Sequence, residues 1–233
     1  MRQAILIFNK EFRDYFASPI AYIVIAIFLA VIGWLFFSTF FLFDQADMRG
    51  FFGLLPIFFA LVVPIVTMRL FSEELNVGSY ELLLTLPVTF RDIIVGKYLA
   101  AVAFVAALLV PTLAYPIFIS FLGDLDWGVV AGGYVGALLL GSAYAAIGLF
   151  ASSLTRNQII ACIVAIVICI PLAIFDQMLY FFPQSILDVF SYLSANAHFS
   201  NIAKGIIDSR DLVYFLSIAF IGLYATHLVM EEK

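Results

Sequence analysis

The chain has 233 residues, of which 65% are hydrophobic and only 12% are charged, and its mean hydropathy is +1.13. A soluble domain carries about 25% charged residues, so this composition excludes an ordinary soluble protein and indicates an integral membrane protein. The net charge of −5 gives no support to a nucleic-acid partner.

Residues 1–17 predict an amphipathic helix ahead of the first membrane span. The apolar positions that recur at helical spacing are Ile5, Phe8, Phe12 and Tyr15 or Phe16. Charged residues, Arg13 among them, fill much of the remaining surface. Such a helix would lie in the plane of the lipid headgroups or dock against a partner. The break at Ser18-Pro19 would then turn the chain into the membrane.

Six uncharged runs are long enough to cross about 30 Å of hydrocarbon as helices. The predicted spans extend over about residues 20–43, 51–70, 92–122, 128–153, 158–180 and 212–230. The first run exceeds the apolar region of a signal peptide, about 7–15 residues, so we expect it to be a retained span. The sequence therefore predicts a single all-α membrane domain over residues 1–233.

The distribution of lysine and arginine predicts the orientation, because these residues are in excess on the cytoplasmic side. With both termini inside, the inner set is Arg2, Lys10, Arg13, Arg69, Arg91, Lys97, Arg156 and Lys233. The outer set is then Arg49, Lys204 and Arg210. This bias predicts cytoplasmic termini and a cytoplasmic loop between the second and third spans.

A second amphipathic segment precedes the last span, on the predicted outer side. Its apolar stripe consists of Ile186, Phe190, Leu193 and Ala197. Residues 183–211 are therefore expected to form one or two short helices that dip into the outer leaflet, and a solvated loop is the alternative.

Small residues recur at four-residue spacing along the fourth span, which favours close approach of helices. They are Gly132, Gly133, Gly136, Gly141, Ala145, Gly148 and Ser152. Packing within the subunit and a seam between two subunits are both compatible with this pattern.

Several kinds of chemistry find no support in the sequence. Within the uncharged runs themselves, residues 18–43, 50–68, 98–123, 127–155, 157–175 and 212–230, His227 is the only ionisable side chain of the histidine, lysine or acidic type, which argues against proton-coupled transport. His198 and His227 are predicted on opposite sides, so they cannot share a metal ion. Lys97 follows Gly96 but precedes Tyr98, which breaks the phosphate-loop pattern, so any ATP would be bound by another chain.

The loop between the second and third spans, residues 69–97, concentrates charge between two apolar runs and is expected to lie in water. Residues 70–77 can continue the second helix beyond the membrane, with Glu73 and Glu74 exposed, until Gly78 breaks it. Thr89 and Asp92 have the spacing of a capping box, so the third helix is expected to start in the cytosol.

Between these two breaks lies a short leucine-rich piece, YELLLTL, in which Glu81 would face water. Its apolar side chains are Leu82, Leu83, Leu84 and Leu86, and Pro87 ends it. So small a helix cannot form a core alone. It would pack back on the spans or insert into a groove on another protein.

With the six-span pattern, the stretch FSEELNVGSYELLLTLPVTFRDIIVGKY resembles the loop of type-2 ABC exporter (ABC-2) permeases. The stretches KEFRDYFASPIAYIVIAIF, GLFASSLTRNQIIA and HFSNIAKGIIDSRDLVYFLS look like the gliding-motility-type branch of that family. The resemblance extends over essentially the whole chain. It implies a multi-pass subunit of the bacterial cytoplasmic membrane that pairs with a second copy or a paralogue.

The resemblance also implies a coupling helix that docks into a separately encoded ATPase, which would bind ATP and Mg²⁺. The residues that would form or flank this contact are Glu73, Glu74, Gly78, Glu81, Leu82, Leu83, Leu84 and Pro87. The interfacial helix, with Phe8, Phe12 and Arg13, would also touch the ATPase. This chain itself would hold no catalytic residue, metal or cofactor, and an auxiliary membrane protein with an external domain could accompany it. The rival interpretation is a force-transmitting scaffold through which nothing crosses.

Overall fold

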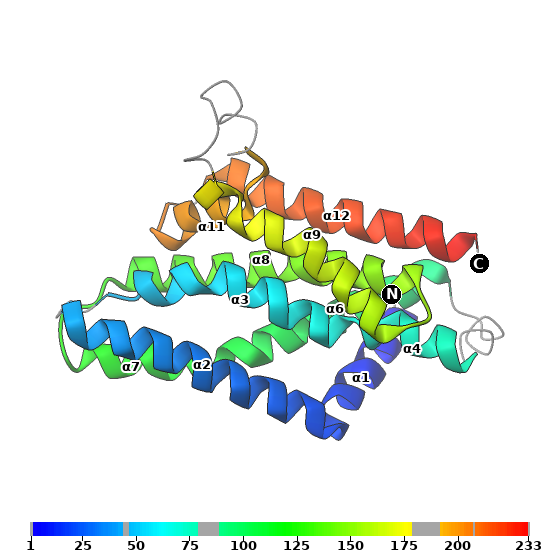
Figure 1. Cartoon of the computed structure of the whole chain (residues 1–233), viewed down its shortest axis with the longest axis horizontal. Helices are drawn as coiled ribbons and strands as arrows, with labels where there is room; N and C mark the ends of the chain where they lie inside the picture. The colour runs from blue at the N-terminus through cyan, green and yellow to red at the C-terminus, as the bar shows by residue number, and fades with distance from the viewer. Residues whose placement is uncertain (1, 44–46, 79–88, 179–191, 207, 233) are drawn as a thin grey trace.

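The computed structural model describes residues 2–43, 47–78, 89–178, 192–206 and 208–232, and all regular structure in these ranges is helical (Figure 1). The elements are α1 (Arg2–Ala17), α2 (Pro19–Phe43), α3 (Arg49–Thr67), α4 (Arg69–Val77), α6 (Phe90–Leu109), the 3₁₀ turn η1 (Val110–Leu113), α7 (Ala114–Ser120), α8 (Trp127–Leu154), α9 (Gln158–Met178), α11 (Ala195–Ala203) and α12 (Ser209–Glu231).

The predicted six membrane spans are confirmed within these ranges. The helical segments long and apolar enough to cross a bilayer are Pro19–Phe40, Arg49–Val77, Phe90–Ser120, Trp127–Leu154, Gln158–Asp176 and Ser209–Glu231. Both chain ends lie toward the end of the bundle that carries α4, whereas α11 lies at the opposite end (Figure 1). An even number of spans returns the chain to the side on which it started.

α8 is the central span of the bundle, with 72% of its apolar window buried, compared with 22% for α9 and α12. Its glycines allow this packing, because a side chain at Gly133 would overlap the ring of Phe52 and one at Gly148 would overlap Thr67. At these positions the small residues serve packing within the chain. The sparsely buried α9 and α12 leave apolar faces for lipid or for another subunit.

The second span is interrupted at Met68, where α3 gives way to α4, and a side chain from α8 occupies the break. Ser152 Oγ accepts hydrogen bonds from the amides of Phe71 (2.9 Å) and Ser72 (3.0 Å). It also donates to the carbonyl of Met68 (2.8 Å). The hydroxyl therefore stands in the place of the ordinary bond between residues 72 and 68, and such an insertion bends a helix.

The third span, predicted over about 92–122, is divided into two helices, as expected from the prolines Pro111 and Pro116 within it. α6 ends at Leu109, and one 3₁₀ turn precedes α7. Pro111 lies in that turn and Pro116 in the first turn of α7. Proline lacks an amide hydrogen and clashes with the carbonyl four residues earlier, which accounts for the interruption.

The expected short helix before the last span is present as α11, with Ser194 as its N-cap (Ala197 N to Ser194 Oγ, 3.3 Å). Its buried face differs from the predicted stripe. Leu193 is exposed, whereas Phe199 and Ile202 are buried, because the cap starts the helix only at Ala195 and thereby sets its phase. Ile186 and Phe190 lie outside the described residues.

Candidate functional site

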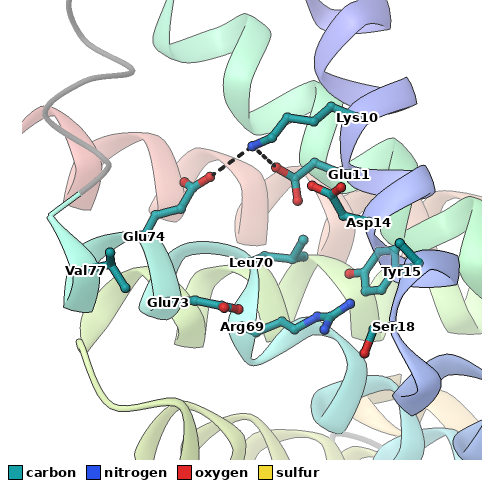
Figure 2. Close-up of a pocket in the computed structure, with 11 residues that line it drawn as sticks. Lys10, Glu11, Asp14, Tyr15, Ser18, Arg69, Leu70, Glu73, Glu74 and Val77 are labelled. Carbon is teal, nitrogen blue, oxygen red and sulfur yellow. Dashed lines mark hydrogen bonds and ion pairs between the residues drawn. The ribbon is translucent and has the colours of Figure 1, made fainter.

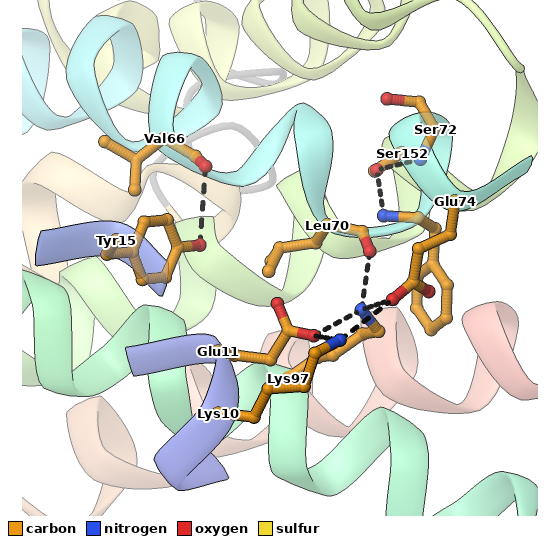
Figure 3. Close-up of polar contacts among 10 residues, drawn as sticks. Lys10, Glu11, Tyr15, Val66, Leu70, Ser72, Glu74, Lys97 and Ser152 are labelled. Atoms are coloured by element: carbon orange, nitrogen blue, oxygen red, sulfur yellow. Dashed lines mark hydrogen bonds and ion pairs between the residues drawn. The ribbon is translucent and has the colours of Figure 1, made fainter. Parts of the chain in front are cut away.

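Three helices that are distant in sequence meet at the end of the bundle near both termini, around the side chain of Lys97 (Figure 3). Lys97 is only 1% exposed. Its Nζ donates to Glu11 Oε1 of α1 (2.9 Å), to Glu74 Oε1 of α4 (2.8 Å) and to the carbonyl of Leu70 (2.8 Å). An ammonium group has three hydrogens, so every donor is used. We call these four residues the Lys97 junction.

The two glutamates compensate the buried cation, which would otherwise be strongly unfavourable inside the protein. The side chains of Glu11 and Glu74 are 12% and 13% exposed. The Lys97 Nζ also lies 5.2 Å from the centre of the Phe71 ring. Moving any one of α1, α4 or α6 away from the others would separate buried opposite charges, so the junction holds these helices together as one unit.

α1 can approach α6 closely because the residue before Lys97 is glycine. A Cβ at Gly96 would lie 2.8 Å from the carbonyl oxygen of Ala4 and 2.8 Å from Ile7 Cβ. Any side chain there would push α1 outward. The Gly96-Lys97 pair therefore supplies both the space and the charge that seat α1 on the third span.

The inner face of α1 agrees only in part with the predicted stripe. Phe8 and Phe12 are half-buried, with ring centres 5.8 Å apart, and Tyr15 is buried, while Arg13 is exposed. Ile5, however, is 56% exposed. The reason is that the side of α1 that carries Glu11 packs toward Lys97. Ile5 is then left on the outer face of the helix, where an interfacial helix can contact lipid.

Tyr15 extends the contact between α1 and the second span. Its hydroxyl donates to the carbonyl of Val66 (3.4 Å), and the Arg69 guanidinium lies 5.0 Å over its ring. Burial, together with the negative charge of Glu11, raises the pKa of Tyr15, so the phenol stays protonated and acts as a donor.

An open cleft of about 520 Å³ separates α1 from α4 beside the junction (Figure 2). Its charged lining consists of Lys10, Glu11, Asp14, Arg69, Glu73 and Glu74. Lys10 Nζ lies 3.5 Å from Glu11 Oε1 and 3.9 Å from Glu74 Oε1. Partial burial acts to lower the pKa of Lys10, but the charges of Glu11 and Glu74 outweigh it and raise that pKa. The cleft therefore places a second, exposed cation near the same carboxylates.

The structure places some of the predicted coupling residues beside this cleft. Glu73 is exposed, as predicted. The expectation that Glu74 is exposed is wrong, because the ion pair with Lys97 draws it inward. Lys97, expected in water, is likewise buried. Gly78 ends α4, as predicted, and it does so in the left-handed conformation (φ 76°).

The leucine-rich piece itself lies outside the described residues, which resume at Thr89. Its predicted contact residues are Glu81, Leu82, Leu83, Leu84 and Pro87. The predicted capping box at the start of α6 is confirmed, since Asp92 N donates to Thr89 Oγ1 (3.2 Å). The segment 79–88 is thus flanked on one side by α4 and on the other by α6, both of which contribute to the Lys97 junction.

The junction offers chemistry that holds helices together. In the described part of the chain, no group of three histidine, cysteine or acidic side chains could hold a metal ion. Lys97 has no free donor for a phosphate, since all three hydrogens go to protein oxygens. Glu11, Lys97 and Ser152 were not singled out as site residues from the sequence, and they carry most of this geometry.

The comparisons with known proteins agree with the architecture. The family model described as "ABC-2 family transporter protein" matches residues 5–218, nearly the whole chain. No curated protein matches the chain in sequence.

Proposed function

Because the chain belongs to the ABC-2 family of transporter proteins, we propose that it is the permease subunit of an ABC exporter and is driven by an ATPase on a separate chain. The observation that carries this proposal is the Lys97 junction. It connects the interfacial helix α1 to both flanks of residues 79–88. Force applied to that segment would reach three helices together.

In this proposal the ATPase contacts the segment after Gly78. Glu81 provides a charge for the partner, and Leu82, Leu83 and Leu84 provide an apolar face that fits a hydrophobic groove. Glu73 flanks this contact on the exposed side of α4. ATP and Mg²⁺ are held by the ATPase, because the Gly96-Lys97 sequence lacks the phosphate-loop pattern and the Lys97 ammonium is fully engaged.

Phe8 and Phe12 act in this proposal as the packed core of the interfacial helix, and Arg13 remains exposed to headgroups or to the ATPase. A second permease chain, a copy or a paralogue, would contribute the other half of the pathway. The sparsely buried faces of α2, α9 and α12 provide surface for that chain and for lipid. In this proposal the Lys97 junction and both termini lie in the cytoplasm of a bacterial cell, and the positive-inside distribution of lysine and arginine supports this orientation.

The proposal is tested by uncoupling the ATPase from the membrane chain. The chain is coexpressed with its ATPase in membranes, and ATP hydrolysis by the purified complex is measured for Glu81→Arg combined with Leu83→Asp. We expect normal membrane insertion and loss of the bound ATPase. Glu232→Arg, at an exposed residue at the end of α12, is the matched charge reversal and should retain the ATPase. A double variant that binds and stimulates the ATPase like the wild type refutes the coupling assignment.

The alternative function, a force-transmitting subunit through which nothing crosses, is favoured by the tight packing between α3 and α6. The cavity between α3 and α6 has a volume of only about 10 Å³ and is lined mainly by apolar side chains, including Val63 and Phe104. A scaffold needs no aqueous path within its spans.

Cysteine accessibility distinguishes the two functions. Cys162 and Cys169 are first replaced, and single cysteines are then placed along the exposed faces of α2, α9 and α12 in the complex. A transport pathway predicts ATP-dependent labelling by a membrane-impermeant reagent on one of these faces. Protection of all three faces with and without ATP indicates the scaffold.

A further inference from the structure

A second polar cluster lies at the opposite end of the bundle from the Lys97 junction, where α11 meets the first turn of α12. His198 Nδ1 lies 2.6 Å from Asp211 Oδ1. The histidine side chain is 12% exposed and the aspartate side chain 4%. Two ionisable groups are thus almost removed from solvent at the start of the last span.

The imidazole ring is held on its other sides by residues around the start of α11. His198 Nε2 lies 3.2 Å from the carbonyl oxygen of Tyr192. The ring of Tyr214 stacks on the imidazole, with centres 4.1 Å apart and planes at 23°. The Tyr214 hydroxyl donates to the carbonyl of Leu193 (2.6 Å). The imidazole of His198 and the stacked ring of Tyr214 therefore together connect residues 192–193 to α12.

Both ring nitrogens face oxygen atoms, and this fixes the number of protons that the cluster needs. A backbone carbonyl only accepts, so the bond to Tyr192 requires a hydrogen on Nε2. The short contact to Asp211 requires a second hydrogen between Nδ1 and the carboxylate. A neutral histidine beside an ionised aspartate has only one hydrogen for these two bonds. With both hydrogen bonds formed, the cluster therefore contains one proton more than a neutral histidine and an ionised aspartate together.

The carboxylate of Asp211 depends on His198 for a partner. Asp211 Oδ2 is buried and has no hydrogen-bond partner among the described residues, so His198 supplies the compensation for the carboxylate. A cavity of about 520 Å³ beside the ring is also lined by Asp208, the N-cap of α12, and by Arg210 in the first turn of that helix. α9 contributes Asp176, whose carboxylate lies 3.5 Å from the Asn196 amide.

The contacts of α11 with α8 are apolar. α8 meets α11 through Gly132 and Gly136, which face Ile202 and Phe199. Within the described ranges, the hydrogen bonds of His198 go to Asp211 and Tyr192, and none goes to α3 or α8.

We propose that His198 and Asp211 form a proton-dependent clasp that joins the start of α11 to α12. With the extra proton bound, both bonds are complete and the clasp is closed. As pH rises and the proton leaves, Nε2 presents a lone pair to the Tyr192 carbonyl, the bond is lost, and residues 192–197 separate more easily from α12. The clasp is therefore closed at low pH and opens with rising pH. The proposal does not depend on the identity of an ATPase partner.

The chain has two histidines, which makes a direct test possible. In His227→Gln, at the opposite end of α12, His198 is the sole histidine. Nuclear magnetic resonance of histidine-labelled full-length protein in nanodiscs then reports the protonation of both ring nitrogens from about pH 5 to 9, which brackets the ordinary range of histidine. Hydrogen exchange of the amides at residues 192–197 is followed in the same samples.

We expect both ring nitrogens to be protonated at the acidic end, and amide exchange at 192–197, corrected for intrinsic rate, to become about fivefold faster as the proton leaves. Exchange in the core of α8 should not change in step. In Asp211→Asn combined with His227→Gln, the pH-dependent change at 192–197 should disappear. A ring with one proton at every pH, or exchange that does not follow its protonation, overturns the proposal, and neither result requires the aspartate variant to fold.

Discussion

Lys97→Met is the perturbation that examines the junction most sharply, because methionine keeps an unbranched apolar side chain and removes the ammonium group. In the variant, Glu11 and Glu74 lose the cation that both of them contact within 3 Å. The carbonyl of Leu70 also loses its side-chain donor. We therefore expect a large loss of stability from a single substitution.

The magnitude follows from the burial of the partners. Removing one member of a buried ion pair costs about 3–5 kcal/mol, because the remaining charge is left uncompensated. Glu11 and Glu74 are 12% and 13% exposed and line the open cleft, so they can turn toward water. We expect the lower end of that range, about 3 kcal/mol, which corresponds to roughly a 100- to 200-fold change in the unfolding equilibrium.

The assay is reversible unfolding of the full-length chain in mixed micelles, followed by tryptophan fluorescence. Lys10→Met is the matched control, because Lys10 faces the same two carboxylates but its side chain is 58% exposed. Its loss should cost less than about 1 kcal/mol. Adding Glu11→Gln and Glu74→Gln to Lys97→Met should restore stability to within about 1 kcal/mol. Equal effects of Lys97→Met and Lys10→Met would refute the reasoning.

Three further changes test the local geometry by the same unfolding measurement. Gly96→Ala should destabilise by about 1–3 kcal/mol because its Cβ collides with α1, whereas Gly53→Ala, which meets nothing within 4 Å, should be neutral or stabilising; equal effects would contradict the close-approach argument. Ser152→Ala should cost about 1–3 kcal/mol because two buried amides lose their acceptor, and a neutral result would contradict this role of the hydroxyl. Thr89→Ala should cost about 1 kcal/mol through loss of the N-cap of α6, while Thr89→Ser should retain most of it.

The spans and the local breaks could be predicted because their causes are local. Length and hydropathy decide whether a helix can cross a bilayer. The Thr89 cap and the left-handed Gly78 follow from a few neighbouring residues, and both are present. The interruption of the third span also has a local cause in Pro111. The form of the interruption, a 3₁₀ turn, depends on how the neighbouring helices pack.

The Lys97 junction could not be derived in the same way, because its partners come from three separate parts of the sequence. A charged residue between two apolar runs is predicted to lie in water when it is considered without its partners. One signal was nevertheless present: Lys97 shares a helical face with Ile93, Ala100 and Phe104, which are all buried. A lysine within an apolar face predicts a buried cation that needs carboxylates, but the sequence does not say which ones.

The hydrogen bonds at the break in the second span similarly have a non-local origin. Ser152 reaches the second span from α8, more than eighty residues away along the chain. Pro64 lies one turn before Met68, but nothing in the sequence identifies Ser152 as the partner of the amides that follow. Side chains that complete the hydrogen bonds of another helix are visible only once the helices are placed together.

The central claim is that this membrane chain is driven by an ATPase on another chain. The most direct measurement is purification of the tagged full-length protein in a mild detergent, after coexpression with the neighbouring genes, and identification of the proteins bound to it. The account predicts an ABC ATPase in stoichiometric amount, lost on combining Glu81→Arg with Leu83→Asp. Recovery of the intact membrane chain without any ATPase would contradict it.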